Sequence, residues 1–373
     1  MDKPFDAIVL GLGAMGSATL YQLAKRGLRV LGIDQFSPPH DRGSSHGDTR
    51  ITRLAIGEGE QYTPLAMRSH EIWREIEAQT GADLLTTTGG LILSSAGPRG
   101  TCHGTDFFDN TLAAAQSFGI RHEILDAREI RRRFPPFAVR DDEVGYYEHE
   151  AGFLRPEACV AAQLQLAGRL GAEIHRGEKA LQFTQDAGAV RLRTEQGEYS
   201  ANRLIVTAGP WLPGLLGRTW AGRFTVRRQT LFWFDVPGPL EAFLPGRFPV
   251  FIWEQAGQEQ PIYGFPATDG PRGGVKIASE QHGVATTPEA VQREVAQEEA
   301  LALFERQIAP CFPDLSGECV KARSCLYTMT ADFQFVIEAH PEYPQVTIAS
   351  PCSGHGFKHS AAIGERLALL VTG

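Results

Sequence analysis

The sequence lacks the features of several protein classes. None of its apolar runs approaches the roughly 20 residues that a membrane-spanning helix needs. Positive charge is not in excess, because 44 Asp and Glu residues outnumber 36 Lys and Arg residues and the formal net charge is −8. This balance disfavours a general nucleic-acid binder, which needs clustered cations. Met1–Lys3 lead straight into an apolar stretch without a basic leader, so we expect no signal peptide.

Cysteine is also scarce. The six cysteines, at positions 102, 159, 311, 319, 325 and 352, show neither CxxC spacing nor a dense framework. Disulfide-rich scaffolds and zinc ribbons need such patterns. We therefore expect reduced thiols in a cytoplasmic enzyme, with no metal site.

The chain does contain a glycine-rich turn close to its start. The apolar run FDAIVL is followed by GLGAMG and a helical pattern, so Gly11, Gly13 and Gly16 fit G-x-G-x-x-G between a strand and a helix. A second strand, RVLGID, ends in Asp34. Glycines let the backbone approach a pyrophosphate, and a carboxylate after the second strand accepts ribose hydroxyls. The pattern predicts dinucleotide binding and disfavours NADP. It does not separate NAD from FAD, and an ordinary βαβ unit with a glycine-rich turn is the alternative.

The remaining pattern predicts two interleaved domains in a chain of 373 residues. Helices are expected over 62–78, 110–118 and 155–170, and RLIVTAGPW reads as a strand stopped by Gly209 beside the dinucleotide. Four strands between 226 and 281 suggest a mainly antiparallel sheet. We expect a mixed α/β fold, in which a Rossmann-like FAD-binding domain (1–84, 150–220 and 321–373) carries an inserted, mainly antiparallel β-sheet substrate domain (85–149 and 221–320).

Several motifs together resemble the monomeric sarcosine oxidase and N-methyltryptophan oxidase family of flavoenzymes. They are GLGAMG, PPHDRGSSHGDTRITR, GEGEQY, YGFP with a lysine beyond it, CLYTMT and SGHGFK, and their order matches from one end to the other. The resemblance implies FAD linked covalently through a cysteine. It also implies oxidation of a secondary amino acid, N-methyl or cyclic, by hydride transfer to flavin N5, an imine product, and reoxidation by oxygen to hydrogen peroxide. The expected partners are a small amino acid and oxygen, with no nucleic acid or membrane, and the chain is expected to be a monomer.

The resemblance also assigns residues. Cys325 matches the flavin-linked cysteine, although from the residues alone it reads as a buried core thiol. Arg50 would lie over the flavin, and Arg53 and Lys358 would bind the substrate carboxylate. Lys276 would stabilise negative charge as oxygen is reduced. The implied catalytic groups are Arg50, Lys276, His46 and Tyr327, and the substrate-binding groups are Arg53, Tyr263, Lys358 and Glu280. The implied cofactor-binding residues are Gly11, Gly13, Met15, Gly16, Asp34, Ser44, Ser45, His46, Thr49, Arg50, Ala180, Gly209, Trp211, Cys325, Gly354, His355, Gly356, Phe357 and Lys358.

Alternatives remain open for these side chains. If residues 50–53 turn helical, Arg50 and Arg53 can address the same space. The alternative is that both are exposed helix residues paired with Asp48, Glu58 or Glu60. Lys276 also reads as a solvated strand lysine, and Tyr263 as a buried tyrosine that only packs in the sheet. His355 reads as filling a turn, and His359 is expected on the surface.

The chain departs from the family pattern at Ser45, which replaces the first of a His–His pair, and at Glu280, which stands where sarcosine oxidases carry a histidine. The loop from Tyr263 to Lys276 is also about two residues longer, and the sequence stops at Gly373 where relatives continue, so a trimmed or disordered terminus is an open expectation. Glu280 facing the cavity would favour a cationic or bulkier substrate over sarcosine. Rival functions are a flavin dehydrogenase that passes electrons to a quinone or carrier, an NAD-dependent dehydrogenase, and a flavin-binding protein without turnover.

Overall fold

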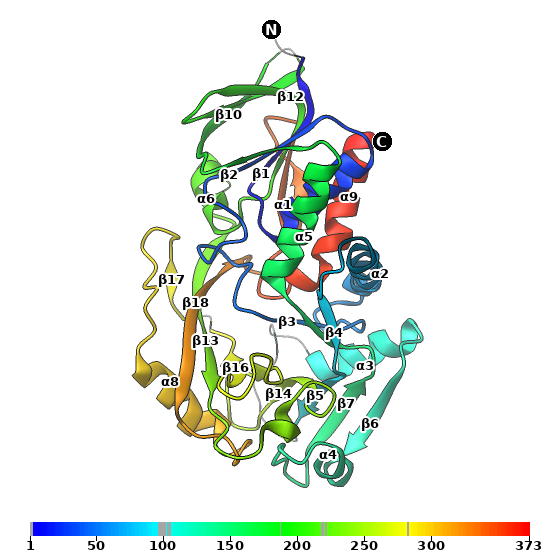
Figure 1. Ribbon diagram of the computed structural model, residues 1–373, viewed down its shortest axis with the longest axis vertical. Coiled ribbons are helices and arrows are strands. Elements are labelled where there is room, and N and C mark those ends of the chain that lie inside the picture. Colours follow the sequence, from blue (N-terminus) through cyan, green and yellow to red (C-terminus); the bar gives the residue numbers. More distant parts are fainter. Residues whose placement is uncertain are drawn as a thin grey trace.

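The structure is a computed structural model that describes residues 3–95, 102, 106–186, 188–217, 220, 222–281 and 283–373. Figure 1 shows two large sheets at opposite ends of the long axis, with a few short strands between them. Within the described residues, no helix combines the length and the apolar character needed to cross a bilayer.

The first sheet carries the predicted dinucleotide unit. Its central strand β1 (Phe5–Leu10) pairs in parallel with β2 (Val30–Asp34) on one side and with β12 (Glu198–Val206) on the other. Two more strands pair in parallel: β9 (Glu173–Arg176) with β2, and β20 (Val346–Ser350) with β12. Three antiparallel strands complete the eight: β11 (Ala189–Thr194) pairs with β12, β10 (Ala180–Asp186) with β11, and β19 (Val336–Ala339) with β20.

Helices pack together beside this sheet, as Figure 1 shows for α1, α5 and α9. They are α1 (Ala14–Lys25), α2 (Thr63–Thr80), α5 (Pro156–Arg169) and α9 (Ser360–Thr372). The contact between α1 and α9 is close, because a Cβ on Gly364 would lie 2.5 Å from the Cβ of Ala18. The C-terminal helix is therefore held directly against the helix that follows the glycine turn.

The second sheet is the predicted antiparallel one. Its strands run in the order β17-β13-β16-β15-β14-β5-β7-β6, with β18 on the free side of β13, and only the β14–β5 pair is parallel. Their bounds are β5 (Gly90–Ser94), β6 (His122–Asp126), β7 (Val144–Glu148), β13 (Thr225–Phe234), β14 (Val250–Glu254), β15 (Ile262–Gly264), β16 (Val275–Ser279), β17 (Ala285–Thr286) and β18 (Cys319–Met329).

A small sheet lies between the two large ones (Figure 1). Its strands β3 (Arg50–Thr52) and β4 (Leu85–Thr87) both pair antiparallel with β8 (Gly152–Leu154). The remaining short elements are η1 (Glu60–Tyr62), α3 (Phe107–Ser117), α4 (Ala127–Arg133), η3 (Gly209–Trp211), α6 (Leu212–Leu215), η4 (Leu240–Phe243), α8 (Gln297–Leu303), η5 (Phe304–Ile308) and η6 (Phe357–His359).

The predicted fold class is confirmed: helices and several sheets form a mixed α/β structure with a Rossmann-like unit. The three predicted helices correspond to α2, α3 and α5, and α3 begins earlier, at Phe107. The domain boundaries stay a prediction. Strand β18 lies mostly in the predicted nucleotide-binding segment 321–373, yet it pairs along its length with β13 of the antiparallel sheet.

Candidate active site

A cavity of about 610 Å³ runs from the glycine turn toward the antiparallel sheet. Its wall at one end is the β1–α1 turn, where only glycines fit: a Cβ on Gly16 would lie 1.7 Å from the carbonyl oxygen of Gly11. The turn places the N-terminus of the 12-residue helix α1 at the cavity. Free backbone N–H groups at such a terminus favour an anion such as a pyrophosphate.

Asp34 lines the same cavity at the end of β2. Its Oδ2 accepts a hydrogen bond from the Leu12 backbone N–H at 2.7 Å, and its Oδ1 accepts one from Phe36 at 2.8 Å. The carboxylate is therefore fixed against the glycine turn, where it can also accept ribose hydroxyls.

A second glycine loop, with Gly354 and Gly356, also lines the cavity. A Cβ on Gly356 would lie 1.7 Å from the carbonyl oxygen of Pro351, so this loop also requires glycine. It leads through η6 into α9. A glycine turn at a helix N-terminus, a fixed carboxylate and a second glycine loop around one elongated cavity fit a dinucleotide such as FAD.

The structure brings most of the expected cofactor-binding residues into this cavity. Those that line it are Gly11, Gly13, Met15, Asp34, Ser44, Ser45, Arg50, Ala180, Gly209, Trp211, Gly354, Gly356 and Phe357. The others do not line the cavity; they are Gly16, His46, Thr49, Cys325, His355 and Lys358. Sequence reasoning missed Thr207, which lines the cavity and donates from Oγ1 to the Gly11 carbonyl at 2.7 Å. The strand-ending VTAG motif was its only signal.

Cys325 lies on β18 beside Arg50 and His46. Arg50 Nη2 is 3.5 Å from its Sγ, and the thiol is 1% exposed. Burial alone would raise the pKa of Cys325. Electrostatic interaction and a hydrogen bond with His46, and then the charge of Arg50, outweigh this effect and lower the pKa to about 7. A thiol with this pKa is substantially thiolate at neutral pH, which is the nucleophilic form.

The helical conformation considered for residues 50–53 is not formed, because residues 50–52 form the strand β3. Alternation along an extended chain separates the two guanidinium groups. Arg50 donates to the carbonyl oxygens of Thr49 (2.8 Å) and Ser44 (2.9 Å). Arg53 turns instead toward Glu58 and the ring of Phe107, 4.7 Å from its centroid.

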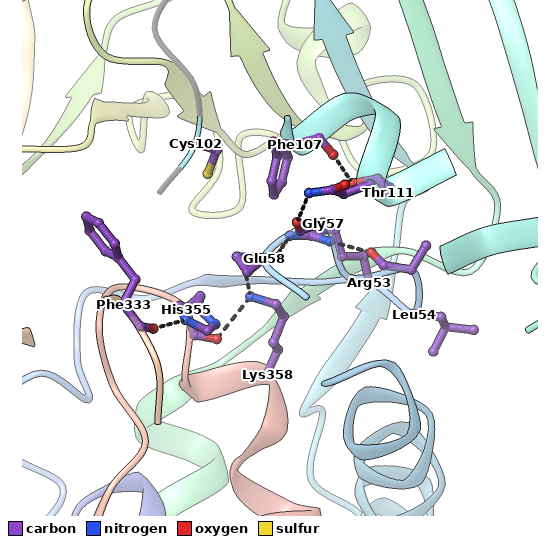
Figure 2. A network of polar contacts seen from close by, with 12 residues as sticks. Arg53, Leu54, Gly57, Glu58, Cys102, Phe107, Thr111, Phe333, His355 and Lys358 are labelled. Atoms are coloured by element: carbon purple, nitrogen blue, oxygen red, sulfur yellow. Dashed lines mark hydrogen bonds and ion pairs between the residues drawn. The ribbon is translucent and has the colours of Figure 1, made fainter. Parts of the chain in front are cut away.

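Arg53 and Lys358 meet at one buried carboxylate, that of Glu58. Arg53 Nη2 forms an ion pair with one oxygen of Glu58, and Lys358 Nζ lies 3.1 Å from the other. Figure 2 shows Glu58 between these two cations. The exposed fractions of Arg53, Glu58 and Lys358 are 3%, 8% and 6%. The alternative reading of Arg53 as an exposed residue is therefore wrong, although its predicted pairing with Glu58 is present. Burial lowers the pKa of Lys358, and the charge of Glu58 opposes that effect.

Lys276 lies on β16 and is 1% exposed. Its Nζ donates to the carbonyl oxygens of Gly47 (2.6 Å) and Thr49 (2.9 Å) and lies 3.2 Å from Thr49 Oγ1. It is therefore not the solvated strand lysine of the alternative reading. Burial lowers its pKa well below the usual value, as does the charge of Arg50.

Tyr263, Tyr327 and Glu280 gather around the same region. Burial raises the pKa of Tyr263 to about 12, and its hydroxyl is hydrogen-bonded to Tyr327, which lines the cavity. Glu280 is buried, and the thiol of Cys102 lies 3.7 Å from its Oε1. Burial raises the pKa of Cys102, and the charge of Glu280 raises it further. Burial and then the charges of Tyr263 and Glu280 raise the pKa of Tyr327, so the Glu280 carboxylate adds negative potential beside the tyrosines.

The two histidines of the last glycine loop are both buried. His355 Nε2 lies 3.0 Å from the Phe333 carbonyl oxygen and its ring stacks on Phe335, as expected of a residue filling a turn. The surface expectation for His359 is wrong, because this residue is 0% exposed and packs near Tyr62 and Phe335. Burial lowers the pKa of His359, so the ring is neutral.

This fold and this cavity define a dinucleotide-binding oxidoreductase with a buried cationic site. The model of the family described as FAD dependent oxidoreductase matches residues 6–370. The chain belongs to this family and is an enzyme, an FAD-dependent oxidoreductase similar to sarcosine oxidase.

Curated relatives span its full length. A monomeric sarcosine oxidase of Streptomyces avermitilis is 43% identical over 375 residues, covering 100% of this chain and 95% of the relative. An N-methyl-L-tryptophan oxidase of Yersinia pestis is 34% identical over 370 residues, covering 98% of this chain and 94% of the relative. The solved structure of NikD, an amino acid oxidase, shares the fold with a TM-score of 0.81 and 21% identity, covering 99% of this chain and 94% of that one.

Proposed function

We propose that this enzyme oxidises the CH–NH group of a secondary amino acid, N-methyl or cyclic, with oxygen as acceptor. The observation that carries the proposal is the buried cationic site of Arg53 and Lys358. Two cations share the carboxylate of Glu58 there, and the carboxylate of a substrate would give them a further partner. Buried charges of this kind are stable only when paired.

Arg53 keeps a donor for that substrate. Its Nε is buried and has no hydrogen-bond partner among the described residues, while its Nη atoms contact Glu58 and the Ala55 carbonyl. A substrate carboxylate can accept from Arg53 Nε and from Lys358 as charge-assisted hydrogen bonds. This anchor would fix the C–H bond next to the amine for reaction.

FAD would be held by the two glycine loops, Asp34 and the 43–50 segment, and would accept a hydride from the substrate and pass the electrons to oxygen, giving an imine and hydrogen peroxide. Arg50 holds positive charge at this end of the cavity, where reduction adds negative charge. Cys325, activated by His46 and Arg50, is the proposed point of covalent attachment. Lys276 holds an ammonium where oxygen gains charge, and Tyr263, Tyr327 and Glu280 line the amine side of the substrate.

All six cysteines are free. This supports the cytoplasm as the proposed location, and a monomer stays a prediction.

A peroxide-coupled screen tests the function on the holoenzyme, with sarcosine, N-methyltryptophan, pipecolate, proline, D-amino acids and glycated amino acids as substrates. We expect hydrogen peroxide in proportion to substrate consumed. Anaerobic bleaching of the flavin without peroxide in air would instead identify a dehydrogenase that uses a quinone or carrier. Flavin that no substrate bleaches would identify a binding protein without turnover.

A further inference from the structure

A tight turn of three residues, Gly47–Asp48–Thr49, holds the ammonium of Lys276. The Thr49 N–H donates to the Gly47 carbonyl at 2.8 Å, and Asp48 has a φ of 67°. An i to i+2 hydrogen bond around a central residue with positive φ is a γ-turn of the rare, strained kind. Such backbone persists only where its surroundings hold it in place.

The turn is held from its other side by Glu157, in the first turn of α5. Its Oε1 accepts hydrogen bonds from the backbone N–H groups of Gly47 (2.6 Å) and Asp48 (3.3 Å). The turn therefore has two faces. One carboxylate takes its N–H groups, while its carbonyl oxygens point to Lys276.

Asp48 links the turn to a second lysine. Its carboxylate forms an ion pair with Lys321 on β18. Trp233 on β13 is in register with both Lys321 and Lys276, and the two ammonium groups lie 4.7 and 5.2 Å from its ring centroid. The indole and the turn together surround Lys276 with negative potential and exclude water.

The charged groups facing Lys276 come from four elements. Arg50 on β3 opposes its protonation, whereas Asp48 in the turn, Cys325 on β18 and Glu157 on α5 favour it. Of these, Cys325 is the proposed attachment point and loses its charge on linkage. In the linked enzyme, Asp48 and Glu157 are the carboxylates that remain to offset Arg50.

We propose that Asp48 and Glu157 are positioning residues that hold the Gly47–Thr49 turn, so that its carbonyl oxygens fix a charged Lys276 beside the oxidation site. This inference rests on the proposed role of Lys276 in the reaction with oxygen. Neither carboxylate belongs to the proposed substrate or oxygen site; both act on Lys276 through the turn and through their charges.

The test separates charge from geometry. Asp48→Asn removes the charge while keeping a residue type that tolerates positive φ, and Glu157→Gln removes the charge while keeping an acceptor for the two N–H groups. ¹⁵N NMR of the holoenzyme follows the Lys276 Nζ titration, assigned with Lys276→Met. We expect Asp48→Asn to move this titration to lower pH by about one unit, and Glu157→Gln to move it less, in the same direction. The rate of flavin reoxidation should fall as the pH rises and Lys276 loses its proton, and the pH of this fall should shift together with the Lys276 titration. The rate of flavin reduction should stay unchanged.

Hydrogen–deuterium exchange of residues 43–53 tests the geometry. Glu157→Ala should speed exchange of the Gly47 and Asp48 amides, whereas Glu157→Gln should not. Asp269→Asn is the matched control, because Asp269 lies 4.0 Å from Lys321 but is not part of the turn; this variant should behave as wild type. Unshifted Lys276 titration in both charge-removing variants, or unchanged exchange in Glu157→Ala, would overturn the inference. If Lys276→Met leaves reoxidation unchanged, the proposed role of Lys276 fails, and the titration and exchange still decide the turn.

Discussion

Glu58 forms ion pairs with both cations of the proposed substrate site, which makes its replacement informative. Glu58→Gln keeps the shape and an acceptor oxygen but removes the charge between Arg53 and Lys358. Side-chain exposures of 4% for Glu58, 4% for Arg53 and 7% for Lys358 leave little water to compensate. Removing one partner of a buried ion pair costs about 3–5 kcal/mol. We expect a loss of unfolding free energy toward the lower end of this range, because the amide still accepts hydrogen bonds.

The same substitution should strengthen binding of external carboxylates. Two uncompensated cations regain a partner when an anion binds, so part of the lost stability returns as affinity. A recovery of about 1.4 kcal/mol corresponds to tenfold tighter binding. Thermal unfolding of the holoenzyme with and without acetate, a carboxylate that cannot be oxidised at a C–N bond, measures both effects at once.

The expected result is a lower melting temperature without acetate and a larger acetate-induced rise than in wild type. Glu60→Gln is the control, because Glu60 is an exposed neighbour in η1. This substitution removes the same charge, but from the surface. A Glu58→Gln protein as stable as the control, with unchanged acetate affinity, would refute the idea that Glu58 stands in for the substrate carboxylate.

Three further predictions follow from the site. Arg53→Ala should raise KM far more than it lowers kcat, with a loss of about 2–4 kcal/mol in apparent binding for a lost charge-assisted pair, measured by steady-state kinetics. In flavin-free protein, the Cys325 pKa of about 7 lies below the ordinary value of 9.0. The thiolate therefore contributes to the unfolding free energy above pH 9, and this contribution is lost as the pH falls through 7. Denaturation of wild type against Cys325→Ser across this window should show that difference, and acid-denatured holoenzyme should retain flavin on the Cys325 peptide by mass spectrometry; complete flavin release would exclude the linkage. Gly356→Ala should abolish flavin binding or folding, because its Cβ would lie 1.7 Å from the Pro351 carbonyl, and a normal flavin spectrum would contradict this.

Local patterns in the sequence were enough to predict the dinucleotide end of the site. The glycine turn, α1 and Asp34 lie within 30 residues, and strand and helix periods determine their arrangement. The antiparallel sheet followed from its turns and β-rich runs. Residues 50–53 were harder, because a short polar segment has no hydrophobic period; β3 forms through pairing with β8, about 100 residues away.

The long-range contacts of Glu157 and His359 were beyond local reasoning, whereas the short-range pairing of Arg53 with Glu58 was among the alternatives. Glu157 lies 110 residues from Gly47 in the chain, and nothing near either residue signals the contact. His359 follows a glycine loop that reads as surface, but the loop folds back against Tyr62 and Phe335 and buries it. Long-range packing, which one sequence does not display, decides both cases.

Two carboxylates of this acidic protein accept hydrogen bonds from backbone N–H groups in the segment that carries Arg50 and Arg53. Glu157 binds the N–H groups of Gly47 and Asp48, and Glu148 binds those of Leu54 and Ala55 at 2.6 and 3.1 Å. Each carboxylate thus secures one end of the 47–55 segment through its main chain. The side chains between them are left to face the cavity and the Glu58 site. These backbone contacts explain how a segment with little secondary structure of its own can position both Arg50 and Arg53.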